Sequence, residues 1–378
     1  MNDLSNFNLT VLSGILKDPL VAAFIRYRSE KTTAARSEFL FQLFEKKAED
    51  NLAEYIKNVV LEDENAFSKA CSAGREISKY LKKAYIADLE TIGRALDFTS
   101  DDFRIGKSTA PIKVWDEKAA NLLNGFYQSN GYGQFISHAE FRYQNGKLSA
   151  VQSPSSLTLN DLKGYESEKQ TVYDNIENFV RKLPYSDMIL YGDRGTGKSS
   201  TVHAMAKFFF SQKLRLIEID KEEISAIPDL KAYLSEIPLR FLIFIDDLSW
   251  NENDDRISRL KTALQGSAEG NANNVMIVAT SDRKYVVGDS AKTNEPELLS
   301  LSDRFGIAVP FSTTDKPTYL DIVHRLAEEE NLSLAEKELD SLAESWALVR
   351  GGRSPRRARQ LIGYLVACRK KGKEIQII

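Results

Sequence analysis

The residues best suited to chemistry in this sequence form the glycine-rich run Gly192-Asp-Arg-Gly-Thr-Gly-Lys198-Ser199. The run has the G-x-x-x-x-G-K-[ST] spacing and lies between a strand-like apolar run and a helical pattern, the context that this motif requires. Glycines let the backbone wrap a phosphate chain, and the start of the next helix adds its positive dipole end. Lys198 is placed to reach the β- and γ-phosphates, and the Ser199 hydroxyl to ligate Mg²⁺. The expected phosphate-binding residues are Gly192, Asp193, Arg194, Gly195, Thr196, Gly197, Lys198, Ser199 and Ser200.

A pair of carboxylates, Asp246 and Asp247, follows a second apolar run, RFLIFID. If this run is a strand of a parallel sheet, both acids lie at the carboxyl edge of the sheet, beside the phosphates. We expect Asp246 to hold Mg²⁺ through its water shell and Asp247 to act as the base for an attacking water. A solvated turn or a helix cap is the alternative explanation for two acids at the end of a strand.

Five short apolar runs, separated by helix-length patterns, predict the elements that position these side chains. The runs are residues 187–192, 214–220, 240–246, 274–280 and 307–311. Apolar strands alternating with helices indicate an α/β fold with a five-stranded parallel sheet and helices on both faces. The sequence therefore predicts a nucleotide-binding core of the P-loop type.

The segments on either side of this core are predicted to be helical. Apolar positions recur at spacings of three and four before it, with a long helical pattern over 66–95 and a linker or exposed loop over 97–114. Alternating runs around Asn145-Gly146 indicate a β-hairpin. We expect three domains. They are a mostly helical domain at 1–152 with a hairpin near 139–152, an α/β core at 153–316, and a helical lid at 317–378.

Composition excludes several classes of protein. The chain has 378 residues with a formal net charge of −3 and 42% apolar residues, as in an ordinary globular protein. Two cysteines provide neither a disulfide framework nor a four-cysteine zinc site, and they favour a reducing compartment. The amino terminus does not resemble a secretory signal, and no apolar run approaches the roughly 20 residues that span a bilayer. These observations predict a cytoplasmic protein without a membrane partner.

Charge is unevenly distributed along the chain. Nine of the 51 basic residues lie within 349–373, and this segment has no acid. A solvated basic face of the lid is the favoured explanation, with cations in the last turn of a helix adding to its stability. Nucleic-acid binding is a less favoured alternative because Tyr364 is the only aromatic residue in the segment. Binding of a protein partner is the third explanation for the basic segment.

From about residue 160 onward the chain resembles the AAA+ ATPases, and most closely an uncharacterised bacterial ATP-binding family of the domain-of-unknown-function kind. The runs that carry the resemblance are DLKGYE, YGDRGTGKSS, LRLIEIDKEE, RFLIFIDDLSW, LKTALQG, NVMIVATSDRK, LSLSDRFG and GGRSPRRARQLI. The resemblance implies a core and a helical lid with Mg·ATP bound between them. It also implies a homo-oligomer. From the architecture alone, we expect the amino-terminal domain to recognise an unknown protein partner.

The resemblance assigns further roles by position. Leu162, Gly164 and Tyr165 match the segment that borders the adenine. Asp282 lies at the first sensor of the γ-phosphate, and Arg304 at the arginine finger that completes a neighbouring subunit's site. Arg356 matches the second sensor on the lid. Arg357 is the alternative if the register differs by one residue.

Three departures from the family pattern bear on turnover. Asp247 replaces the usual Glu and has a shorter reach, and Asp282 replaces an Asn that would donate to phosphate. Gln265 stands where relatives tend to have Glu. The leading hypothesis is an oligomeric AAA+-type ATPase that acts as a nucleotide-driven switch or remodelling engine. One alternative is an ATP-binding switch or adaptor with little hydrolysis. A small-molecule kinase is less favoured, because such an enzyme needs neither an arginine finger nor a lid sensor.

Overall fold

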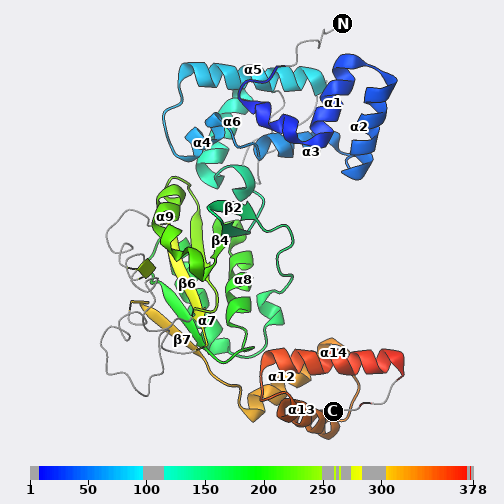
Figure 1. The fold of residues 1–378 in the computed structure, drawn as a ribbon, viewed down its shortest axis with the longest axis vertical. Coiled ribbons are helices and arrows are strands. Elements are labelled where there is room, and N and C mark those ends of the chain that lie inside the picture. The colour runs from blue at the N-terminus through cyan, green and yellow to red at the C-terminus, as the bar shows by residue number, and fades with distance from the viewer. Residues whose placement is uncertain are drawn as a thin grey trace. The chain divides into compact units, whose positions relative to one another are not determined.

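The structure is a computed structural model that describes residues 8–96, 115–248, 259–260, 264, 274–282, 304–372 and 375. The expected linker at 97–114 lies outside this set. The chain divides into two compact units, shown in Figure 1. The first unit comprises Met1–His138 with Glu236–Leu239, and the second comprises Ala139–Ser235 with Arg240–Ile378.

The first unit is helical. Its described helices are α1 (Pro19–Glu30), α2 (Thr33–Glu45), α3 (Leu52–Leu61), α4 (Ala66–Ser72), α5 (Lys79–Leu96) and α6 (Glu117–Asn130). The single long helix expected over 66–95 is wrong, because Gly74 adopts a φ of +65° after α4, a conformation that ends helices. The unit is held together by stacking of Phe67 on Tyr85, with ring centroids 3.8 Å apart, and by the buried Asp88 carboxylate, which accepts the backbone N–H groups of residues 10–12.

The second unit contains a sheet of seven described strands in the order β2-β1-β4-β5-β6-β3-β7. The strands are β1 (Glu140–Gln144), β2 (Lys147–Ala150), β3 (Met188–Gly192), β4 (Leu214–Ile219), β5 (Arg240–Ile245), β6 (Val275–Ser281) and β7 (Ile307–Phe311). All neighbouring strands are parallel except β1 and β2.

The α/β fold with a parallel sheet is confirmed, but the expected number of five strands is too low. The five expected strands are β3 to β7, and the hairpin at β1 and β2 extends their sheet because β1 pairs in parallel with β4. The hairpin therefore belongs to the sheet unit, and the structural division falls after His138 instead of after residue 152. This long-range pairing leaves no local pattern in the sequence.

Helices cover the sheet and set the position of its carboxyl edge. Helices α7 (Glu166–Val180) and α8 (Lys198–Phe208) bury their apolar residues against one face. Helix α9 (Ile227–Ser235) contacts β6 and contributes no residue to that cluster. The central strands bury long apolar runs, such as Met188–Leu190 in β3 and Phe241–Ile245 in β5, as expected of a sheet covered on both faces.

Three helices after the sheet form the lid and enclose an apolar core of their own (Figure 1). They are α12 (Lys316–Glu329), α13 (Glu336–Val349) and α14 (Pro355–Lys371). Helices α12 and α14 begin in the same way: Asp315 and Ser354 accept backbone N–H groups of the first turn, and a proline lies within that turn. The cap at Ser354 fixes the start of α14, on which the expected lid arginines lie.

Most arginines of the basic segment are used within the second unit. Arg353 donates to both oxygens of Glu344, at 2.9 and 2.7 Å. Arg357 donates to the carbonyl of Gly352 just after α13, and Arg369 to the carbonyls of residues 330 and 331 just after α12. Cations at helix carboxyl ends satisfy the terminal carbonyls and stabilise the helix dipole. Three arginines of the basic segment, Arg353, Arg357 and Arg369, therefore help to hold the lid helices together.

Candidate functional site

The loop between β3 and α8 is built from glycines in conformations that other residues rarely adopt. Gly192, Gly195 and Gly197 have φ values of +133°, +83° and +101°. At Gly192 a Cβ atom would lie 2.1 Å from the backbone oxygen of Phe311 in the neighbouring strand. The loop can therefore turn tightly beside β7 and direct its backbone N–H groups toward a bound anion.

Lys198 and Ser199 occupy the first turn of α8, directly after this loop. The Lys198 ammonium group donates to the carbonyls of Gly192 and Asp193, at 2.6 and 2.9 Å, and its side chain is only 8% exposed. The Ser199 hydroxyl donates to Asp246 at 2.6 Å. The first turn of α8 thus places a buried cation and a hydroxyl group beside the loop, as phosphate and Mg²⁺ binding require.

The two acids after β5 differ in their surroundings. Asp246 accepts hydrogen bonds from both Ser199 and the Thr280 hydroxyl, whose oxygen in turn accepts the backbone N–H of Asp247 at 3.0 Å. Asp247 adopts a φ of +52°, and its side chain is 56% exposed. Asp246 is therefore fixed for a ligand role, while the Asp247 carboxylate faces solvent.

Asp282, the residue after β6, meets the cations of the phosphate loop. One of its carboxylate oxygens accepts a hydrogen bond from Nε of Arg194, and the other lies 3.5 Å from Nζ of Lys198. This hydrogen bond and the charge of Asp282 raise the pKa of Arg194. Arg194 also lies 3.8 Å from Asp247. The loop, the end of β5 and the end of β6 are thereby linked by charge.

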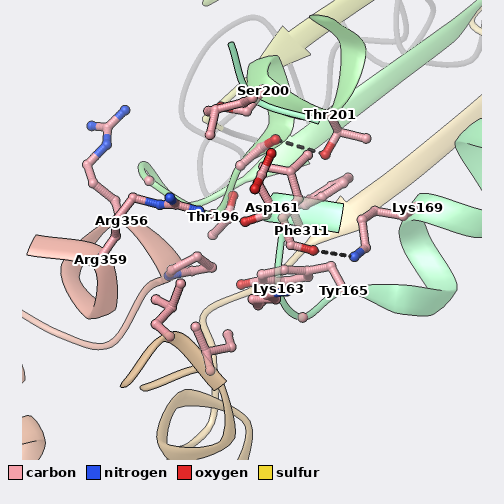
Figure 2. Close-up of a pocket in the computed structure, with 18 residues that line it drawn as sticks. Asp161, Lys163, Tyr165, Lys169, Thr196, Ser200, Thr201, Phe311, Arg356 and Arg359 are labelled. Atoms are coloured by element: carbon pink, nitrogen blue, oxygen red, sulfur yellow. Dashed lines mark hydrogen bonds between the residues drawn. The ribbon is translucent and has the colours of Figure 1, made fainter. Parts of the chain in front are cut away.

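A cavity of about 240 Å³ lies between the loop and the lid, lined from both sides (Figure 2). The expected residues Leu162, Gly164 and Tyr165 line it together with Gly195, Thr196, Gly197 and Ser200 of the loop. The Tyr165 hydroxyl donates to the carbonyl of Ser312 at 2.5 Å, and burial raises its pKa. The apolar wall is completed by Phe311, with its ring centroid 5.2 Å from that of Tyr165.

The lid contributes Arg356 and Arg359 to this cavity from the first two turns of α14 (Figure 2). The backbone N–H of Arg356 donates to the carbonyl of Gly195 at 3.3 Å, so the lid touches the phosphate loop directly. Arg359 donates to the carbonyl of Asp161 at 2.6 Å. Arg357 instead donates to the carbonyl of Gly352 and does not line the cavity.

Arg304 lies at the amino ends of the strands, whereas the phosphate loop lies at their carboxyl ends. Strands β3 and β7 run in parallel, with Met188 paired to Ile307 at the amino ends and Gly192 to Phe311 at the carboxyl ends. Arg304 precedes β7 and lines a separate hollow with residues 182–187. The structure therefore brings together the expected site residues on the loop, the strand ends and the lid, but not Arg304.

Residues 136–369 match a family that is described as a protein of unknown function (DUF815). The chain belongs to the DUF815 family. The expected resemblance to an uncharacterised family of the AAA+ type is confirmed.

The curated relatives cover part of this DUF815 chain. The replication factor C large subunit of Methanococcus maripaludis is 22% identical over 200 residues, which is 51% of this chain and 38% of the relative. An AAA-ATPase of Arabidopsis thaliana is 27% identical over 154 residues, or 38% of this chain and 30% of the relative. The chain thus spans well under half the length of these relatives.

Two solved structures are similar in part. The RuvB Holliday junction branch migration motor of Thermotoga maritima has a TM-score of 0.42 and 17% identity, covering 58% of this chain and 68% of that protein. The FIGL-1 AAA domain in complex with ADP has a TM-score of 0.41 and 18% identity, covering 58% of this chain and 76% of that domain. Likeness at this level does not extend to function.

Sequence reasoning missed three residues of the DUF815 site. Thr280 orients both acids after β5, and its place at the end of β6 is a signal that was available. Arg359 lies one turn after Arg356 on the same face of α14. Lys169 lines the cavity and donates to the carbonyl of Leu162 at 2.6 Å, but nothing in its local sequence indicates this contact (Figure 2).

The donor set of the site fits Mg²⁺ bound with a nucleotide. Ser199 and Asp246 offer the hard oxygen atoms that Mg²⁺ prefers, and the glycine cradle offers N–H groups to phosphate. Among the residues that the structure describes, no group of three or more His, Cys, Asp or Glu side chains is arranged for a metal ion. Within the same residues no helix is long and apolar enough to cross a membrane.

A second polar pair joins α8 to β1, with its histidine one turn after Ser199 on α8. Nδ1 of His203 lies 2.9 Å from the buried carboxylate of Glu140 in β1. Burial disfavours the charged imidazole, but the hydrogen bond and charge of Glu140 outweigh it and raise the pKa of His203. The hairpin strand is therefore tied to the helix that carries Lys198 and Ser199.

Proposed function

We propose that this DUF815 protein is an AAA+-type ATPase that binds Mg·ATP between the sheet edge and the lid. The observation that carries the proposal is the convergence of Lys198, Ser199 and Asp246 at the glycine loop, which Arg356 of the cavity wall contacts through its backbone N–H. In this proposal Lys198 and the loop N–H groups bind the phosphates, Ser199 and Asp246 hold Mg²⁺, and Tyr165 borders the base. The similarity to an AAA-ATPase of Arabidopsis thaliana supports it.

We further propose that the protein works as a homo-oligomer in the cytoplasm. Arg304 lies at the sheet edge remote from the cavity of its own chain, and an arginine there can stabilise transition-state charge only in a neighbouring subunit. The helical first unit would recognise the protein on which the assembly acts. Nucleic acid is not part of the proposal, because Arg353, Arg357 and Arg369 of the basic segment are engaged within the lid.

Nucleotide binding is tested by isothermal titration calorimetry with Mg·ATP. We expect the Lys198→Ala variant to lose measurable binding, because it removes the buried cation that reaches the phosphates. The matched control is Lys370→Ala, which removes an exposed lysine at the far end of α14 and should bind as the wild type does. Undiminished ATP affinity in Lys198→Ala would refute the proposal.

A second candidate is an ATP-binding switch with little hydrolysis. The motivating observation is that Asp247, already shorter than the usual Glu, is exposed and lies 3.8 Å from Arg194. Among the described residues its carboxylate accepts no hydrogen bond that would direct it to a reacting water. A phosphate-release assay separates the two candidates. Turnover at background level with ATP still bound supports the switch, and turnover that rises with protein concentration supports the oligomeric ATPase.

A further inference from the structure

Asp282 lies close to both Arg194 and Lys198, whereas Asp247 lies near Arg194, at 3.8 Å. Asp246 is engaged by two hydroxyl groups, whereas the carboxylate of Asp282 bonds to Arg194 and approaches Lys198 within 3.5 Å. A lysine at this position of the loop contacts the β- and γ-phosphates in P-loop proteins. The Asp282 carboxylate therefore lies where a terminal phosphate would make the same contacts.

The position of Asp282 is set by the sheet. Ser281 pairs with Tyr191 at the carboxyl ends of β6 and β3, one residue before Gly192, and Ser281 is buried. The backbone of Asp282 therefore stays beside the start of the phosphate loop whatever the side chain does. Arg194 is different, because its side chain is 77% exposed on the loop and can turn between the carboxylate and a phosphate.

Two anions at this place repel each other and share the same cations. Like charges brought together in a binding site weaken binding. The cost falls on the terminal phosphate of a triphosphate, since the diphosphate ends at the β-phosphate and is bound chiefly by the loop N–H groups.

We propose that Asp282 sets the preference of the site between nucleoside triphosphate and diphosphate by competing with the terminal phosphate for Lys198 and Arg194. The inference rests on the proposed nucleotide binding and deepens it. Its consequence is that the wild-type protein holds ADP more tightly, relative to ATP, than the same site does without this charge. For ATP to bind, Arg194 then has to leave the Asp282 carboxylate and bind the terminal phosphate instead.

The test compares the dissociation constants of ATP and ADP, each measured by calorimetry with Mg²⁺ and again with EDTA. Asp282→Asn removes the charge at nearly constant shape, and Asp282→Glu retains it. Asp174→Asn is the matched control, because it removes one negative charge from an exposed position on α7. Thermal unfolding of each variant checks that the fold is kept.

We expect Asp282→Asn to tighten ATP binding about tenfold, or about 1.4 kcal/mol, and ADP binding less than threefold. The effect should be larger in EDTA, where no Mg²⁺ ion offsets the charge of the phosphates. Asp282→Glu and Asp174→Asn should leave the ratio of the two constants unchanged. ATP binding by Asp282→Asn, but not by the wild type, would also support the inference.

A ratio that stays within twofold in Asp282→Asn, or weaker ATP binding, overturns the inference. If the wild type binds both nucleotides and loses them on Lys198→Ala, that result leaves the proposed function standing. If neither the wild type nor any Asp282 variant binds either nucleotide, both proposals fall together. The two failures are thus distinguishable.

Discussion

Replacing Gly192 with alanine tests whether the phosphate loop depends on the close approach of β3 and β7. A Cβ atom at this position would lie 2.1 Å from the backbone oxygen and 2.6 Å from the carbonyl carbon of Phe311. Because both are backbone atoms, rotation of a side chain cannot relieve the overlap. The φ of +133° is in addition a conformation that alanine rarely adopts.

The expected loss in the free energy of unfolding of Gly192→Ala is the sum of two costs. Holding a non-glycine residue in such a conformation costs about 1–3 kcal/mol. Relieving the overlap requires the end of β7 to move away by about 1 Å, which breaks the last ladder hydrogen bond at about 1 kcal/mol. The expected destabilisation of the sheet unit is therefore about 3 kcal/mol. For a unit of this size it corresponds to a fall in melting temperature of about 6–12 °C.

Differential scanning calorimetry measures the effect, with Gly363→Ala as the matched control. Gly363 lies in the exposed face of α14, with no atom within 4 Å of an added Cβ, so alanine there should stabilise the lid by about 0.5–1 kcal/mol. We also expect Gly192→Ala to weaken ATP binding, since the loop begins at this residue. A melting temperature within 2 °C of the wild type would show that the approach of the two strands does not constrain the loop.

Three further predictions follow from the site. Arg304→Ala should leave ATP affinity unchanged and lower turnover by at least a hundredfold, measured by calorimetry and phosphate release; equal turnover would exclude a role in a neighbouring site. Because the folded pKa of His203 is raised, its protonation stabilises the fold below about pH 6.5, and this stability is lost as the pH rises through the folded pKa. Urea unfolding should show this decline in the wild type but not in His203→Gln, and a decline of equal size in both would contradict it. Arg359→Ala removes the hydrogen bond to the Asp161 carbonyl and should weaken ATP binding about three- to tenfold without lowering the melting temperature by more than a few degrees.

Much of the site was predictable because its residues are set by local sequence. The spacing from Gly192 to Ser199 specifies a strand, a loop and a helix start, and this order is what the structure contains. Asp246 could be placed because a buried apolar strand has to end at the edge where the loop lies. The contacts that the sequence did not predict join segments far apart in the chain. They include the pairing of β1 with β4 and the bond from Arg194 to Asp282, whose partners are decided by packing of the whole sheet.

The break between α4 and α5 was missed for a different reason. Helical periodicity continues through 66–95, and a single glycine in such a pattern costs only about 1 kcal/mol, which does not by itself predict an end. In the structure Gly74 takes the left-handed conformation, and its N–H donates to the carbonyl of Cys71. Tertiary packing of α4 and α5 on α6 favours two shorter helices over one long one.

The arginines of α14 determine how the lid responds to ionic strength. Arg357, Arg359 and Arg369 on α14 donate to backbone carbonyls, which are uncharged, whereas Arg353, just before the helix, is paired with the Glu344 carboxylate. Salt screens attraction between opposite charges far more than it weakens a hydrogen bond to a neutral oxygen. The lid should therefore stay assembled in concentrated salt, and Arg359 should keep its contact with Asp161. The same salt concentration would release an anion that is held on α14 by charge alone.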